Sequence, residues 1–261
     1  MEGNAPFNKA YNFSKPLDIY FEIETLAKHL APTSLIHFSD SIFNLNWDSK
    51  SDLIDRLTKS NYDLNFSCDT RVDLMTVDQV KQMANAGFKY IRMGFENVND
   101  DILAMSNKSI SNSMQIEACD LIRRVDNSIA IHAYMMTGLP GTKRTTLMND
   151  ALSIRDLILN DHVDIVGNKI FVPYPGLGYS ESKNSSLFID TKEWKRYDRR
   201  SYPVYHFLDL SAEEIYSGYL FQEAILTQTY KEKLEKQGVV NNFKNVSYGL
   251  DYLFTSYAAD N

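Results

Sequence analysis

Three charged side chains stand at the ends of predicted strands: Asp40, Arg71 and Glu96. In parallel α/β folds the chemistry gathers at the carboxyl ends of the strands, so we expect these side chains to face one cavity. Carboxylates can accept hydrogen bonds from an ammonium group or from sugar hydroxyls, and an arginine can clamp a carboxylate in a bidentate fork. The set therefore suits a zwitterion such as an amino-acid moiety. The alternative interpretation is that each is a cap or a surface ion pair, because Ser-Asp-Ser around Asp40 is ordinary turn chemistry.

Two turns rich in glycine and proline follow later strands. They are Thr137-Gly138-Leu139-Pro140-Gly141 and Pro173-Tyr174-Pro175-Gly176. The first leads into a predicted helix whose N-terminus could bind an anion, although it could also serve only to turn the chain.

These residues depend on an alternation of strands and helices. Apolar runs predict strands at 35–38, 64–68, 89–93 and 129–136, with a fifth inside 163–172. The intervening helices begin at side chains suited to capping, namely Ser14, Thr76 with Gln79, Thr142, and Ser211 with Glu214. Parallel strands need long crossovers, so this order predicts a parallel sheet covered by helices.

The predicted strands carry polar residues, which are Asn65, Arg92, His132 and Lys169. Central strands of an open doubly wound sheet would be almost continuously apolar, so the pattern favours a partial barrel whose interior binds something. We expect this α/β unit to occupy residues 1–180. Residues 181–261 are expected to form an aromatic-rich, mainly helical extension, with loops and short turns over 179–210 and no assignment for 239–261.

Composition narrows the class of protein. The 261 residues have a net charge of −7, with 44% hydrophobic and 23% charged residues, as in an ordinary globular protein. An acidic chain is not expected to have a broad nucleic-acid-binding face. No apolar run is long enough to span a membrane, and the first residues resemble neither a signal nor a transit peptide, which predicts a cytoplasmic location.

The two cysteines are Cys68 and Cys119, in different predicted elements. They form no CxxC pair, and the five histidines have no zinc-site spacing, so no metal ligands are predicted. Free cysteines are among the most buried residue types, and we expect both to lie in the core.

The order of the motifs resembles that of the radical S-adenosylmethionine (SAM) enzymes, and especially of the branch that often carries a cobalamin-binding domain. The similar segments are 36–43, 66–75, 86–96, 102–108, 133–142 and 172–176, within roughly residues 15–180. The resemblance implies a partial (β/α)6 barrel with SAM across the strand tops. It assigns Asp40 and Glu96 to the SAM amino group or ribose and Arg71 to its carboxylate. Adenine would be flanked by Met136, Thr137, Gly138, Pro173 and Tyr174.

One feature of the family is missing from the sequence. The family holds a [4Fe–4S] cluster on a CxxxCxxC loop after the first strand, whereas no cysteine precedes Cys68 here. Neither an upstream cobalamin-binding domain nor a DxHxxG run is found, so cobalamin is not expected in this chain. The sequence therefore predicts a barrel without its first βα unit.

Three hypotheses follow. In the first, the chain is the SAM-pocket part of a split biosynthetic enzyme, with a radical SAM or cobalamin-binding partner subunit that supplies the cluster. It is alternatively a pseudoenzyme that acts as a binding or scaffold subunit. The third hypothesis is an unrelated (β/α) hydrolase or isomerase that uses Asp40 and Glu96 as an acid–base pair.

Overall fold

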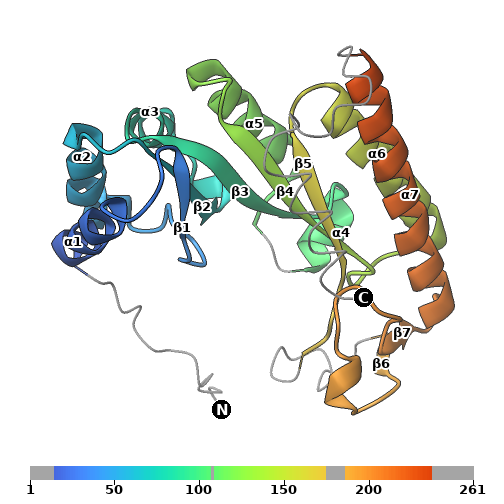
Figure 1. Ribbon diagram of the computed structural model, residues 1–261. Coiled ribbons are helices and arrows are strands. Elements are labelled where there is room, and N and C mark those ends of the chain that lie inside the picture. The colour runs from blue at the N-terminus through green and yellow to red at the C-terminus, as the bar shows by residue number, and fades with distance from the viewer. Residues whose placement is uncertain (1–14, 107–108, 175–185, 237–261) are drawn as a thin grey trace.

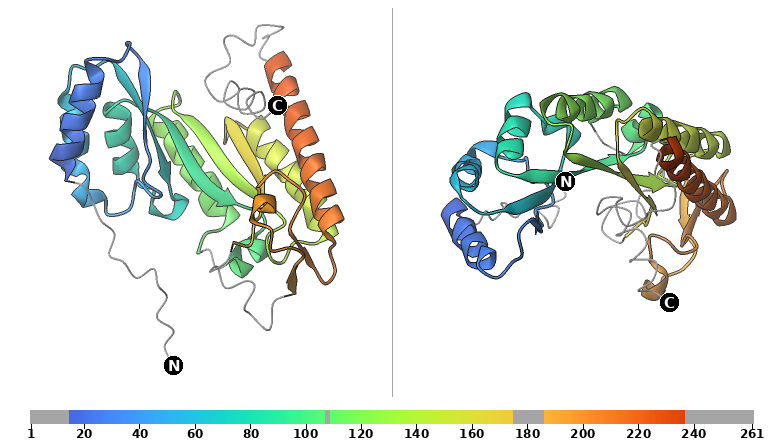
Figure 2. Two further views of the ribbon diagram at one scale, coloured as in Figure 1. Left: turned by 60° about the horizontal axis from the view of Figure 1, so that its bottom comes forward. Right: turned by 45° about the horizontal axis from the view of Figure 1, so that its top comes forward.

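The computed structural model describes residues 15–106, 109–174 and 186–236. Five parallel strands form one sheet in the order β1-β2-β3-β4-β5. The sheet curls into a half-barrel (Figures 1 and 2). The expected partial barrel of parallel strands is thereby confirmed. The strands are β1 (Ser34–Phe38), β2 (Leu64–Thr70), β3 (Phe88–Glu96), β4 (Ala130–Thr137) and β5 (Ile165–Ile170).

Helices cover the convex face of this sheet, as Figure 2 shows. Each crossover helix buries the apolar side of its sequence; α2, for example, buries Leu53, Ile54 and Leu57. The concave face is thereby left for polar side chains. The helices are α1 (Pro16–Ala27), α2 (Ser51–Lys59), α3 (Val77–Asn85), α4 (Asp100–Met105), α5 (Asn112–Val125) and α6 (Arg144–Leu159), with short 3₁₀ turns at Trp47–Ser49 and Val72–Leu74.

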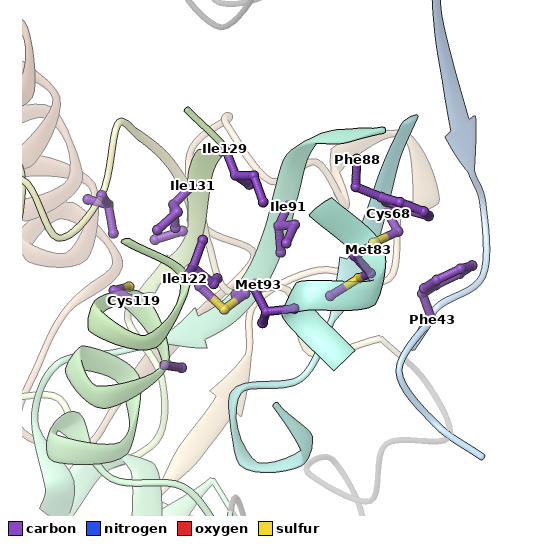
Figure 3. Close-up of a cluster of buried hydrophobic side chains, with 14 of the residues drawn as sticks. Phe43, Cys68, Met83, Phe88, Ile91, Met93, Cys119, Ile122, Ile129 and Ile131 are labelled. Atoms are coloured by element: carbon purple, nitrogen blue, oxygen red, sulfur yellow. The ribbon is translucent and has the colours of Figure 1, made fainter. Parts of the chain in front are cut away.

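The main hydrophobic core lies between the convex face and the helices (Figure 3). Phe43, Met83 and Phe88 are fully buried there, and the rings of Phe43 and Phe88 lie 5.3 Å apart. Both cysteines belong to the same core, as their residue type predicts. This packing holds the strands in place. Their concave face and their carboxyl ends carry the polar residues of the candidate site.

The capping predictions had mixed outcomes. Thr76 and Gln79 form the predicted capping box at α3, and the Ser211 hydroxyl accepts a hydrogen bond from the Glu214 N–H. The prediction for Thr142 is wrong. Its N–H donates to the Leu139 carbonyl in the preceding turn, and the residue at the cap position is Lys143, one residue later, so that α6 begins at Arg144. Ser14 lies outside the described residues.

The extension forms one long helix, α7 (Ala212–Lys236), which packs beside α6 and covers one edge of the sheet. The Tyr230 hydroxyl accepts a hydrogen bond from the Val166 N–H (2.7 Å), and the Arg199 carbonyl accepts one from the Ile170 N–H (2.6 Å). Backbone donors along β5 therefore find partners although no further strand follows it among the described residues.

The other edge of the sheet is different. Within the described ranges, no strand pairs with the outer side of β1. The apolar side chains Leu17 and Phe21 of α1 and Leu35 of β1 are exposed. An uncovered strand edge presents N–H and C=O groups to which another polypeptide can pair. The described half-barrel is thus covered at β5 and open at β1.

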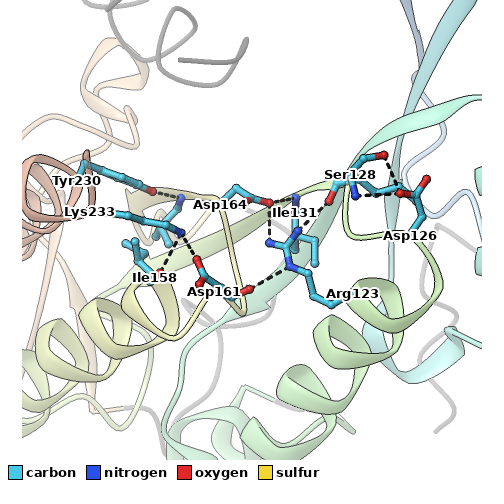
Figure 4. A network of polar contacts seen from close by, with 11 residues as sticks. Arg123, Asp126, Ser128, Ile131, Ile158, Asp161, Asp164, Tyr230 and Lys233 are labelled. Carbon is cyan, nitrogen blue, oxygen red and sulfur yellow. Dashed lines mark hydrogen bonds and ion pairs between the residues drawn. The ribbon is translucent and has the colours of Figure 1, made fainter. Parts of the chain in front are cut away.

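A polar network ties the amino ends of β4 and β5 to the surrounding helices (Figure 4). Arg123 of α5 donates to Asp164 (2.7 Å), and the same carboxylate accepts from the Ile131 N–H (2.7 Å). Lys233 of α7 contacts Asp161 (2.9 Å) and donates to the Ile158 carbonyl (3.0 Å). The network lies at the end of the sheet away from the candidate site, and it accounts for Lys233 at the end of α7.

The segment before α7 corrects the prediction of loops and short helical turns. It contains one 3₁₀ turn (Trp194–Arg196) as expected, but also two antiparallel strands, β6 (Leu187–Ile189) and β7 (Tyr205–Phe207). Sequence patterns missed these strands because each has only three residues, which is too short to show alternation. They pack on a second apolar cluster that includes Leu139, Phe171 and Ile215. The predicted residues Pro175 and Gly176, and the segment 239–261, lie outside the described residues.

Among the described helices, none is both long and apolar enough to cross a lipid bilayer.

Candidate functional site

Asp40, Arg71 and Glu96 lie at the carboxyl ends of three adjacent strands, as predicted. Their contacts differ. Asp40 is exposed, with its carboxylate 3.9 Å from the Lys50 ammonium. The Arg71 guanidinium donates to both oxygens of Asp73 (2.9 and 2.7 Å). The fork that was expected to hold a ligand carboxylate is thus engaged by a neighbouring side chain.

Asn44 links the first two of these strand ends. Its amide donates to the Arg71 carbonyl (2.9 Å), and its side-chain oxygen accepts from the Arg71 N–H (3.0 Å). Asn44 is buried in the loop after β1. The sequence gives no indication of this role, because a single asparagine in a polar loop carries no signal of a contact 27 residues away.

Glu96 has a backbone conformation that few residues other than glycine adopt, with φ of 66°. Its carboxylate folds back over Gly94, where a Cβ atom would lie 3.1 Å from Glu96 Oε1. Gly94 and Arg92 share a strand face because side chains alternate along β3. The carboxylate therefore projects over the concave face, where a ligand in the half-barrel would meet it.

A second polar group lies below the strand ends, on the concave face. The Arg92 guanidinium donates to both oxygens of Asp69 (2.6 and 2.8 Å) and also contacts His37 Nε2. The other His37 nitrogen lies 2.9 Å from the Ser67 hydroxyl. The guanidinium carbon is 5.7 Å from the centre of the Tyr134 ring. Polar residues within strands did predict an interior of this kind, although only Arg92 of this group was named.

His132 lies beside Arg92 on the same face and is held neutral. Burial lowers its pKa to about 3, with further lowering by Arg92 and Lys169. Its Nδ1 lies 2.5 Å from the Tyr90 hydroxyl, and its Nε2 is buried with no hydrogen-bond partner among the described residues. The ring occupies space left by Gly167, whose Cβ would lie 2.6 Å from that nitrogen.

Lys169, the last of the predicted interior residues, lies toward the carboxyl end of β5, in register with Met136. Burial lowers the pKa of its ammonium group, and Arg200 lowers it further, whereas Glu223 raises it. Asn65 lies at the other end of the sheet, where its amide donates to the Thr33 carbonyl (2.8 Å).

The adenine-flanking residues predicted on β4 divide between two faces. Met136 shares the concave face with His132, because the two are four residues apart on one strand. Thr137 instead faces α7, where its hydroxyl donates to Gln222 (2.5 Å), and Asn168 donates to the same oxygen (3.0 Å). Gly138 has φ of 81°, and its carbonyl accepts from the buried Tyr205 hydroxyl (2.6 Å). The extension thus holds the β4 end in place.

The pair predicted after β5 lies beside the extension. Pro173 is buried. The ring of Tyr174 lies 6.3 Å from that of Tyr197, and Arg199 lies over its face at 5.9 Å. This places an aromatic and cationic group at the carboxyl end of β5. Tyr174 was predicted there, whereas Tyr197 and Arg199 come from the segment 179–210, for which only loops and short turns were predicted.

The chain's cysteines do not fit an iron–sulfur cluster. Cys68 and Cys119 are fully buried in the core on β2 and α5, and clusters need thiolates. Burial raises the pKa of Cys68 well above its ordinary value and that of Cys119 to about 12, so both are protonated thiols. Within the described ranges, no three histidine, cysteine or carboxylate side chains are grouped to hold a metal ion.

We therefore expect both thiols to be inert in the native protein. A thiol-reactive disulfide reagent should label neither Cys68 nor Cys119 at pH 8, and both after denaturation, because only a solvent-accessible thiolate attacks. Labelling is measured by absorbance and by mass spectrometry of the intact chain. Rapid native labelling of either residue would contradict the buried assignment.

Comparisons with known proteins agree with this fold. The model of the radical SAM superfamily matches residues 6–152, and no curated protein matches the chain. A radical SAM methyltransferase from Kitasatospora setae, TsrM, whose structure contains cobalamin and a [4Fe-4S] cluster, aligns with 68% of this chain and 37% of its own at 15% identity and a TM-score of 0.56. The coproporphyrinogen III oxidase HemN from Escherichia coli aligns with 85% of this chain and 48% of its own, at 16% identity and a TM-score of 0.57.

A third solved structure is the cobalamin-dependent SAM radical enzyme OxsB with aqua-cobalamin bound. It aligns with 92% of this chain and 41% of its own, at 16% identity and a TM-score of 0.57. The chain thus spans less than half the length of each of these three proteins. At these identities the likeness concerns the fold.

Proposed function

Because the chain belongs to the radical SAM superfamily, we propose that it is the SAM-binding part of a split radical SAM enzyme. A partner polypeptide supplies the [4Fe–4S] cluster and the strand beside β1. Membership of the family argues against the third hypothesis, an unrelated hydrolase or isomerase. When bound, SAM supplies an activated sulfonium group; the residues of this chain bind and orient it.

The observation that carries the proposal is the asymmetry of the half-barrel. Its β5 edge is covered by α7 and the segment before it, whereas the β1 edge is open within the described residues. The chain has only two cysteines, and both are buried away from the concave face. A polypeptide that pairs with β1 would bring its own ligands to the open side of the concave face.

The residues at the strand ends have complementary tasks in this proposal. Glu96 over the concave face and Asp40 accept hydrogen bonds from the ammonium group or ribose hydroxyls of SAM. Arg71 turns toward its carboxylate, and the Asp73 oxygens that hold it in the structure compete for the same donors. Met136 and Tyr174 provide apolar contacts for adenine, with Thr137, Gly138 and Pro173 shaping the backbone around it.

The second candidate function is a binding or scaffold subunit of the same family. It is favoured because polar side chains near the strand ends already bond one another and not a ligand. Arg71 is held by Asp73, and Thr137 and Asn168 are held by Gln222. In that case the chain associates with its partner without SAM.

Calorimetric titration of SAM into the purified chain tests the proposal, first alone and then with any partner recovered from the native organism. We expect binding that Glu96→Gln weakens about 10-fold, equivalent to one lost charged hydrogen bond of about 1.4 kcal/mol. The matched control is Glu117→Gln, an exposed carboxylate on α5 that should change nothing. Failure of the complex to bind SAM, with association intact, would favour the scaffold function.

A further inference from the structure

The turn that carries Glu96 needs an external support. Glu96 lies in the left-handed region of the backbone, which is unfavourable for a residue with a side chain. Such a conformation persists only where the surroundings determine it. The next residue, Asn97, is almost fully buried and makes the contacts that hold this turn.

Asn97 joins three elements. Its amide donates to Asp150 of α6 (3.0 Å), and its side-chain oxygen accepts from the Asn99 N–H (2.7 Å). The Asn99 side chain in turn accepts from the Asp101 N–H (3.0 Å) and so caps α4. The hydrogen bond to Asp150 thus fixes the orientation of the Asn97 side-chain amide, which links the end of β3 to the start of α4.

Gln115 of α5 supports the same turn from the other side. It is fully buried, and its amide donates to both the Phe95 carbonyl (2.9 Å) and the Asn97 carbonyl (3.1 Å). These carbonyls flank Glu96 on either side. Gln115 of α5 therefore holds the backbone on both sides of the strained residue, whereas Asp150 of α6 holds the Asn97 side chain.

We propose that Asp150 and Gln115 are positioning residues that hold the Glu96 carboxylate over the concave face for its ligand. The proposal rests on the proposed function, in which Glu96 binds the ammonium group or ribose of SAM. Neither residue touches that ligand. Gln115 acts through the carbonyls of Phe95 and Asn97, and Asp150 acts through the side chain of Asn97.

Packing alone does not account for a carboxyl at position 150. Its neighbours along α6 are the buried residues Leu147, Ala151 and Ile154, which an apolar side chain would suit. Burial raises the pKa of Asp150 to about 6, which the Asn97 amide opposes only in part. Burial of a carboxyl group is unfavourable unless the group is hydrogen-bonded. The Asp150 carboxyl accepts its hydrogen bond from the Asn97 amide.

Two variants of Asp150 separate the hydrogen bond from the volume. Asp150→Asn keeps an oxygen that can accept from the Asn97 amide, whereas Asp150→Leu has a similar size and no acceptor. The control Thr229→Val removes a buried hydroxyl from α7, far along the chain from the turn. Gln115→Leu tests the second support.

Two measurements are made on the purified full chain. Hydrogen–deuterium exchange of peptides that cover residues 94–102 reports the turn without any ligand, and calorimetry reports SAM affinity. We expect Asp150→Leu and Gln115→Leu to speed exchange in these peptides about 10-fold and to weaken SAM binding by a similar factor, the equivalent of one lost buried hydrogen bond. Thr229→Val should leave both measurements within about 2-fold of wild type. Asp150→Asn should keep SAM affinity within the same range and should not speed exchange over residues 94–102.

The two measurements distinguish the possible failures. If the wild-type protein binds no SAM, the proposed function is wrong, and the exchange data still decide whether Asp150 and Gln115 hold the turn. If exchange over residues 94–102 stays at the wild-type rate in Asp150→Leu, the positioning proposal is overturned. A uniform rise in exchange across the chain would also overturn it, because that pattern marks global destabilisation.

Discussion

Replacing Gly138 with alanine is expected to lower the free energy of unfolding by about 3 to 4 kcal/mol. The glycine has φ of 81°, and an added Cβ would collide with the Tyr205 hydroxyl and lie 2.7 Å from a methyl carbon of Ile215. Neither side chain can move freely, because Tyr205 and Ile215 are fully buried. Urea denaturation followed by circular dichroism gives the change in stability.

Gly94→Ala is the matched control for that substitution. Gly94 has an ordinary backbone conformation, and its added Cβ would meet only the end of the Glu96 side chain, at 3.1 Å. We expect a loss of stability below about 1 kcal/mol, together with a displaced Glu96 carboxylate. Equal destabilisation by the two variants would show that the contact between Gly138 and Tyr205 is not the cause.

The fold was predictable from local signals that repeat along the chain. Apolar runs located all five strands of the sheet, and the Thr76–Gln79 capping box marked the start of α3. The polar residues Arg92 and His132 inside apolar strands indicated a concave interior, because no helix-covered face would tolerate them. These features depend on periodicity, which a single sequence displays directly.

The contacts of the site were less predictable because they depend on distant residues. No pattern links Thr137 to Gln222, which lies 85 positions later, or Asn97 to Asp150. The ion pair between Arg71 and Asp73 joins residues only two positions apart, so it was easier to anticipate. Its geometry nevertheless depends on the 3₁₀ turn after β2. Strand ends could thus be named from sequence, whereas the directions of their side chains could not.

The pH dependence of stability should reveal the buried carboxyl of Asp150. Its pKa is raised from 3.8 to about 6 in the folded chain, so folding favours the protonated form. The stabilising contribution is complete below pH 3.8 and is lost as the pH rises through about 6. A shift of this size corresponds to about 3 kcal/mol as an upper bound. Asp150→Asn removes this titration, so its stability relative to wild type should increase across that window.

The stability of Asp126→Asn relative to wild type should change with pH in the opposite direction. Hydrogen bonds from Ser128 lower the pKa of Asp126, so this carboxylate stabilises the fold above its unfolded pKa and loses that effect as the pH falls. Relative to wild type, Asp126→Asn should therefore lose stability as the pH rises, opposite to Asp150→Asn. Urea denaturation at pH 2 to 8 measures both differences, because the Asp126 window lies below 3.8 and that of Asp150 between 3.8 and about 6. Parallel curves for wild type and Asp150→Asn would mean that Asp150 is solvated or paired with a cation in solution, which would remove the reason for a buried carboxyl beneath Glu96.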